Sequence, residues 1–356
     1  MIEKNNYRNL NRCPVKVLIL DTHIISNMAK WKMGKQMDKA TLERVKILYE
    51  YIHRLVRAKK LLCPEIPILQ DEYRLDTRIE ETCEIIVIEL SRGVRFLTHQ
   101  NAEDFQIQLA MKAYIENSVS VDYSKEWYNI YSGDPIKQLL NCDSHVFRFS
   151  WSKKIRDNEH IRERKRFMKD KLRRIKAKDA SRTPTFEEKL NEEYNGYITG
   201  ILKLGFLPYT KEINGKIYFF KNMMGWSILS RHLAYWERLK GQPAGIKEIL
   251  RFYRSEYLRS VPSIEIQAKL WAGFAVYLKS AKPKESDAND IAILATVLPY
   301  ADFIILDKTI ADLARDRLHL DKKYNTKIYK LSETDKLVLE LQQIEKIENP
   351  LDNLFA

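Results

Sequence analysis

The sequence predicts an α/β fold in which a central, mainly parallel sheet is interrupted by a large, mostly helical insertion. Two observations predict this fold. Short apolar segments rich in β-branched residues alternate with segments of helical periodicity near both ends of the chain. A long stretch between them has mostly helical periodicity and contains five of the six tryptophans. Alternating strands and helices are typical of parallel sheets joined by crossover helices.

The first part of the α/β domain is expected at residues 13–98. Val15–Leu20 is apolar and β-branched, so it predicts a buried strand that ends before Asp21. Pro67 favours a helix start, because proline fits the first helical turn. The other elements expected here are helices at about 24–32, 40–58 and 79–91, a short strand at 61–63 that Pro64 stops, and a third strand at 94–98.

A mostly helical, basic insertion is expected at 99–284 and the second part of the α/β domain at 285–347. Within the insertion, Asn214-Gly215 favours a tight hairpin turn. Ser286 is a suitable N-cap for a helix that carries two aspartates in its first turn. The elements expected after it are a helix to about 298, a strand at 303–306, a helix at 309–318, a strand at 327–331 and a helix at 332–347.

The composition of the chain argues against several classes of protein. The chain has 356 residues, 45% hydrophobic residues and a net charge of +13, which excludes a mainly disordered chain. It contains no apolar run of about 18 residues and its first residues are polar, so we expect a cytoplasmic protein without a membrane partner. Four cysteines without a CxxC pair and histidines without an HExxH motif argue against zinc chemistry.

Residues 148–182 carry most of the excess positive charge, with 15 basic and five acidic side chains. Apolar residues recur on one face of this segment, which predicts a basic amphipathic helix that contacts nucleic acid phosphates. A membrane-surface helix or an acidic protein partner stays open as an alternative. The basic side chains expected to contact nucleic acid are Lys153, Lys154, Arg162, Arg164, Lys165, Arg166, Lys169, Arg173 and Arg174.

Acidic residues follow two of the expected strands. Asp21 comes after Leu18–Leu20, and Asp307 comes after Phe303–Leu306. Ligands of open parallel sheets bind beyond the carboxyl ends of the strands, so these two acids are candidates for one site. Each one alone also fits the ordinary role of a helix N-cap.

Two helices supply further candidate acids. Asp287 and Asp290 lie three residues apart and continue into the apolar stripe that should pack on the sheet. Burying carboxylates on the apolar face of a helix costs free energy, unless a cation or the helix dipole compensates their charge. Glu72 follows Ile68 by four residues, on the expected core face, whereas Glu65 and Asp71 are expected to face solvent.

In the order of these acidic residues along the sequence, the chain resembles the PIN-like nuclease domain. The matching stretches are LILDTHII at 18–25, CPEIPILQDEY at 63–73, DANDIAILA at 287–295 and ADFIILD at 301–307. The resemblance covers about 13–98 and 284–331, not the insertion, and implies a three-layer PIN-like domain. It further implies a metal-dependent endonuclease, usually acting on RNA, with Mg²⁺ or Mn²⁺ as cofactor. The implied catalytic metal ligands are Asp21, Glu72, Asp290 and Asp307, with Asp287 as an auxiliary ligand.

Hard divalent ions prefer carboxylate oxygens and neutralise the charge that develops during phosphodiester hydrolysis. Without metal, such crowded acids should have elevated pKa values and support little activity at low pH. His23 stands where a haloacid-dehalogenase-like phosphatase would need a second aspartate, and Asp307-Lys308-Thr309 lacks the DxD pair of a topoisomerase-primase-type nuclease. DNA as substrate, a non-catalytic nucleic-acid-binding protein with a vestigial site, a toxin or phage-defence role, and a protein partner or homo-oligomer stay open.

Overall fold

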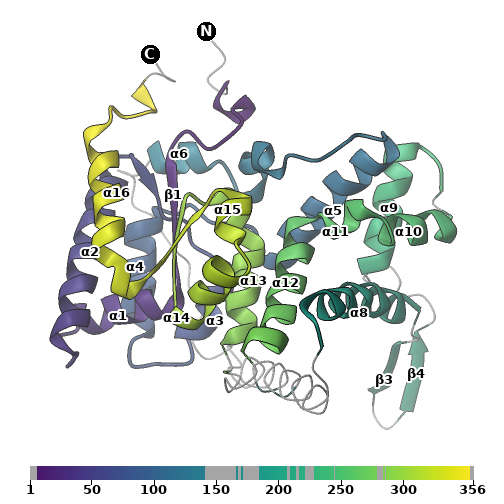
Figure 1. Ribbon diagram of the computed structural model, residues 1–356, viewed down its shortest axis with the longest axis horizontal. Coiled ribbons are helices and arrows are strands. Elements are labelled where there is room, and N and C mark those ends of the chain that lie inside the picture. Colours follow the sequence, from purple (N-terminus) through teal and green to yellow (C-terminus); the bar gives the residue numbers. More distant parts are fainter. Residues whose placement is uncertain are drawn as a thin grey trace.

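The fold is an α/β fold built on a four-stranded, all-parallel sheet, which confirms the expected α/β class and the parallel sheet (Figure 1). The strand order is β2-β1-β5-β6. The computed structural model describes residues 6–140, 166, 170, 184–206, 209–213, 216–220, 228–243, 245–278, 284 and 286–352. None of the helices within these residues is both long and apolar enough to cross a membrane.

The two sequence halves meet in the middle of the sheet. β1 (Lys16–Leu20) pairs in parallel with β2 (Leu61–Leu62) on one side and with β5 (Phe303–Leu306) on the other. β6 (Lys327–Lys330) completes the sheet next to β5. The central strands are short, apolar and almost fully buried, as expected for a parallel sheet covered on both faces.

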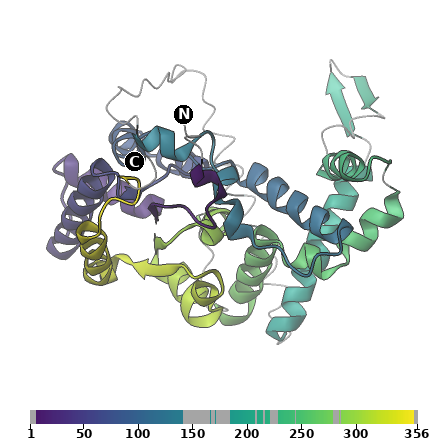
Figure 2. The same cartoon turned by 90° about the horizontal axis from the view of Figure 1, so that it is seen from above.

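Helices lie on both sides of this sheet, with α2 and α16 on one side and α12 and α13 on the other (Figures 1 and 2). In the first half, the helices are α1 (Thr22–Lys32), α2 (Lys39–Arg57), α3 (Pro67–Tyr73) and α4 (Glu80–Ser91). In the second half, they are α13 (Asp287–Val297), α14 (Lys308–Ala311), α15 (Leu320–Tyr324) and α16 (Thr334–Lys346).

The middle of the chain forms a second apolar core among helices, in which Trp236, Phe252 and Tyr253 are fully buried. Its elements are α5 (His99–Ile115), α8 (Phe186–Phe206), α9 (Ile228–Lys240), α10 (Ile246–Tyr253), α11 (Glu256–Arg259) and α12 (Pro262–Tyr277). The expected hairpin is confirmed as antiparallel β3 (Tyr209–Ile213) and β4 (Lys216–Phe220), and its Asn-Gly turn lies outside the described residues.

Three expectations about the elements need correction. Residues 94–98 form isolated bridges, Glu65 with Arg95 and Phe96 with Tyr131, instead of a strand of the sheet. The expected helix at 309–318 divides into α14 and a π-helical segment, Asp312–Arg317. Within the stretch expected to be insertion, the short helices η2 (Tyr123–Ile130) and α6 (Pro135–Leu140) bury apolar side chains in the core of the sheet.

Buried hydrogen bonds tie the helical part to the region of α13. His99 on α5 bonds Thr296 on α13 at 2.9 Å, and the Gln106 amide donates to the Tyr300 hydroxyl at 3.1 Å. α12 packs along α13, as Figure 1 shows near the centre of the molecule. The C-terminal end of α13, the helix that carries Asp287 and Asp290 in its first turn, is therefore tied to α5 of the helical part.

Candidate metal centre

Two of the predicted acids lie at neighbouring strand ends. Asp21 follows β1 and Asp307 follows β5, and these strands pair in parallel with Leu20 opposite Ile305. The Asp21 backbone N–H donates to the Ile305 carbonyl at 3.2 Å, which extends the pairing to the carboxyl edge of the sheet. Both aspartates line one open cleft of about 720 Å³ at this edge.

Three carboxylates converge in this cleft from three separate elements. Glu72 comes from α3 and Asp290 from the first turn of α13, and both meet Asp21 after β1. One oxygen of each lies within 4.8 Å of the other two. Asp21 and Asp290 are each only 5% exposed, and Glu72 is half-buried. A triad of buried acids is an arrangement that a divalent cation stabilises.

Burial and mutual repulsion raise the pKa of two of these acids. Burial raises the pKa of Asp21 to about 7, with further contributions from the charges of Glu72 and Asp307. The pKa of Asp290 lies well above its usual range, because of burial first and then the charges of Asp21 and Glu72. The elevated pKa expected of crowded carboxylates is thus found at two of the predicted positions.

The other two predicted acids lie beside the triad and have partners of their own. Asp307 caps α14 by accepting the Ile310 backbone N–H at 3.0 Å, and it pairs with the Lys284 ammonium at 3.0 Å. Asp287 is buried and accepts the Lys284 backbone N–H at 2.7 Å. Their charges contribute to the raised pKa of Asp290, so both acids act electrostatically on the triad.

Three residues of the site did not emerge from the sequence pattern. The Asn289 amide donates to Glu72 at 2.8 Å and orients that carboxylate toward the triad. The Thr22 hydroxyl lines the cleft and is buried without a hydrogen-bond partner among the described residues. Lys284 supplies the positive charge beside Asp307. Of these three residues, the sequence could have indicated only Asn289. It is a third polar residue, between Asp287 and Asp290, in a helix that is expected to be buried.

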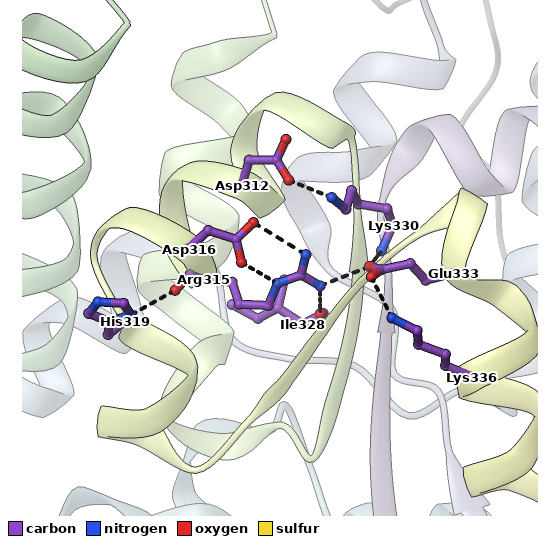
Figure 3. Close-up of polar contacts among 8 residues, drawn as sticks. All are labelled: Asp312, Arg315, Asp316, His319, Ile328, Lys330, Glu333 and Lys336. Carbon is purple, nitrogen blue, oxygen red and sulfur yellow. Dashed lines mark hydrogen bonds and ion pairs between the residues drawn. The ribbon is translucent and has the colours of Figure 1, made fainter.

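Four lysines line the cleft: Lys30, Lys284, Lys308 and Lys330. Figure 3 shows how the edge after β6 is held: Lys330 pairs with Asp312 at 2.6 Å. Arg315 donates to the Ile328 carbonyl at 2.9 Å and to Glu333 at 2.8 Å, which ties the π-helical segment to the end of β6 (Figure 3). The cleft therefore has an acidic centre and basic edges.

The expectation that Glu65 faces solvent is wrong. Glu65 is buried, and its carboxylate accepts a hydrogen bond from Gln70, which itself accepts one from Arg74 at 2.7 Å. The Glu65 backbone bonds Val94 and Phe96, so the residue lies inside the sheet region and not on its surface. The side chain of Asp71 lies outside what the structure describes.

The predicted nucleic-acid contacts lie almost wholly outside the described residues. Arg166 is the exception: it lies in helical backbone and its side chain is exposed. The others, outside the described residues, are Lys153, Lys154, Arg162, Arg164, Lys165, Lys169, Arg173 and Arg174. Searches found that the chain matches no family model, no curated protein and no solved structure.

The donor set fits a hard divalent cation. Asp21, Glu72 and Asp290 offer carboxylate oxygens at a spacing that one ion can span, and carboxylate oxygens are the ligands that Mg²⁺ and Mn²⁺ prefer. The buried Thr22 hydroxyl, with no partner among the described residues, offers one more oxygen at the same edge of the cleft. A soft metal finds no support here, because the described cysteines lie elsewhere.

Proposed function

We propose that the protein is a metal-dependent nuclease that hydrolyses phosphodiester bonds, with RNA as the expected substrate. The observation that carries this proposal is the convergence of Asp21, Glu72 and Asp290 within 4.8 Å in an open cleft. Mg²⁺ or Mn²⁺ is the proposed cofactor. The arrangement of an α/β sheet with acids at its carboxyl edge also supports the proposed PIN-like class.

When bound, the ion would neutralise charge that develops on the phosphate. Asp21, Glu72 and Asp290 would hold it in their ionised forms, so binding would require the release of protons that burial retains on Asp21 and Asp290. Asn289 keeps Glu72 oriented, and such partners of ligands affect metal affinity strongly. We assign Asp307 and Asp287 to the electrostatic surroundings of the triad.

The substrate class follows from charge. The net charge of +13 and the lysines that line the cleft favour a polyanion over a small neutral substrate. Lys30 and Lys308 line the same cleft as the three carboxylates and are the candidates for contacts to backbone phosphates. RNA is preferred because the resemblance of the acidic motifs points to a class that usually acts on RNA.

The test is cleavage of single-stranded RNA, single-stranded DNA and double-stranded DNA in the presence of Mn²⁺ or EDTA. We expect Mn²⁺-dependent cleavage by the unmodified protein and loss of cleavage in Asp290→Asn. Asp335→Asn is a matched control, because Asp335 also lies in the first turn of a helix but is exposed. Cleavage that survives EDTA, or that Asp290→Asn leaves intact, would contradict the proposal, as would no cleavage of any substrate.

A further inference from the structure

Lys284 joins the two predicted acids that lie outside the triad. Its backbone N–H donates to Asp287 at 2.7 Å, and its ammonium donates to Asp307 at 3.0 Å. The charges of Asp287 and Asp290 also act on this ammonium, and together with the Asp307 bond they raise the pKa of Lys284. The lysine is thus a cation built into the acidic centre.

The other lysines of the cleft do not share this arrangement. Lys330 is directed to Asp312, within the network that holds the end of β6 (Figure 3). Lys30 and Lys308 form no ion pair with an acid among the described residues. Lys284 is therefore the lysine that the structure pairs with a predicted site acid.

This pairing affects how many metal ions the centre holds. Two-ion nuclease sites keep their ions about 3.5–4 Å apart and need carboxylates for both. The triad supplies the ligands of one ion, and Asp307 is the remaining acid at the strand ends. One Asp307 oxygen accepts the Ile310 N–H and the other accepts the Lys284 ammonium. A second ion at Asp307 would have to displace Lys284.

We infer that the centre binds one divalent ion, at Asp21, Glu72 and Asp290, and that the Lys284 ammonium occupies the position of a second ion beside Asp307. This inference rests on the proposed function. The lysine then faces the same phosphate as the bound ion and contributes a fixed positive charge to it. A centre that combines one metal ion with the Lys284 ammonium needs a lower concentration of free metal than a centre that binds two ions.

The test counts Mn²⁺ ions bound to the full-length protein by electron paramagnetic resonance, with Asp290→Asn giving the number bound outside the cleft. We expect one cleft ion in the unmodified protein. In Lys284→Gln we expect two, with the spectrum of a magnetically coupled pair, because Asp307 is released. Lys284→Arg keeps the cation and should bind one. Lys308→Gln removes the same charge from another part of the cleft and should also bind one.

Two cleft ions in the unmodified protein, or one in Lys284→Gln, would overturn this inference and leave the nuclease proposal standing. No cleft ion in any of the proteins would overturn the proposed function as well. Circular dichroism of each variant checks that the fold is unchanged, so that a changed ion count reflects the site. We expect an unchanged fold in the Lys284 variants, because the Lys284 side chain is 57% exposed and its replacement leaves the core intact.

Discussion

Two of the buried carboxylate clusters among the described residues are built in opposite ways. Glu265, on α12 in the helical part, is 5% exposed and is bonded by Lys269 at 2.6 Å, by Lys323 and by the Tyr324 hydroxyl at 3.1 Å. Burial alone would raise its pKa, but the hydrogen bonds from the two lysines outweigh burial and lower the pKa of Glu265.

At the sheet edge, Asp21 and Asp290 have comparable burial but form no ion pair with a lysine or arginine among the described residues. Asp21 and Asp290 face each other and Glu72, and both have a raised pKa. Lys284, the lysine that approaches the centre, pairs with Asp307 instead. A buried acid that is paired with its own lysines keeps its charge, whereas buried acids that face one another repel and favour binding of a cation from outside. This difference distinguishes the candidate site from an ordinary buried ion pair.

The largest effect should come from removing one triad carboxylate. Asp21→Asn should lower the rate of RNA cleavage at saturating Mn²⁺ about 1,000-fold, because several kcal/mol of transition-state stabilisation depend on the ion. Glu265→Gln should leave the rate within about threefold, since Glu265 lies in the other cluster. Single-turnover cleavage of a labelled RNA measures both. Equal losses in the two variants would show that the two clusters do not differ in function.

Asn289→Ala should weaken Mn²⁺ binding about 10- to 100-fold, the range typical of residues that orient a metal ligand. The cause is loss of the 2.8 Å hydrogen bond to Glu72. Isothermal titration calorimetry measures the affinity. Asn129→Ala is the matched control, because Asn129 donates to Glu126 at the same distance but is exposed. An unchanged Mn²⁺ affinity in Asn289→Ala would remove this residue from the site.

Glu265→Gln should destabilise the metal-free protein by about 1–3 kcal/mol, because it breaks a buried pair while the lysines left behind keep partial access to water. Urea unfolding measures the free energy of unfolding. Asp21→Asn should act in the opposite direction at pH 8 in EDTA, since the Asp21 carboxyl group, with a pKa of about 7, is then charged and repels its neighbours. If both variants are destabilised equally, the contrast between the two clusters is wrong.

The last prediction concerns pH. The folded protein keeps a proton on Asp21 up to about pH 7, whereas the unfolded chain releases it near the ordinary value of 3.8. Between these values the folded state binds more protons, so the stability of the metal-free protein should fall as pH rises from about 4 to 7. Thermal unfolding in EDTA measures this, and Asp21→Asn should flatten the decline. A decline of the same size in Asp21→Asn would assign it to other groups.

The sequence predicted those features that depend on short-range patterns. The strands that precede Asp21 and Asp307 are continuous apolar runs, so their parallel pairing and shared edge could be anticipated. Glu72 was identified because it lies one helical turn after Ile68 on α3. Local sequence patterns are enough to predict these positions, because such patterns do not depend on how distant segments pack against one another.

The features that were missed depend on contacts between distant segments. Glu65 was expected in solvent, but the chain at 94–96 bonds its backbone and buries it. Glu265 lies in a largely apolar helix, and its partner Lys323 is 58 residues away in the sequence. Lys284 precedes the acidic helix in a charged stretch, so only the folded structure distinguishes it from its neighbours. Such pairings cannot be obtained from local spacing.

The most direct test of the central claim is a crystal structure of the protein soaked in Mn²⁺, with anomalous diffraction data that locate the ion. We expect one strong anomalous peak in contact with oxygens of Asp21, Glu72 and Asp290. The absence of a peak at these three side chains, in crystals of a protein that cleaves RNA with Mn²⁺, would contradict the proposed metal centre.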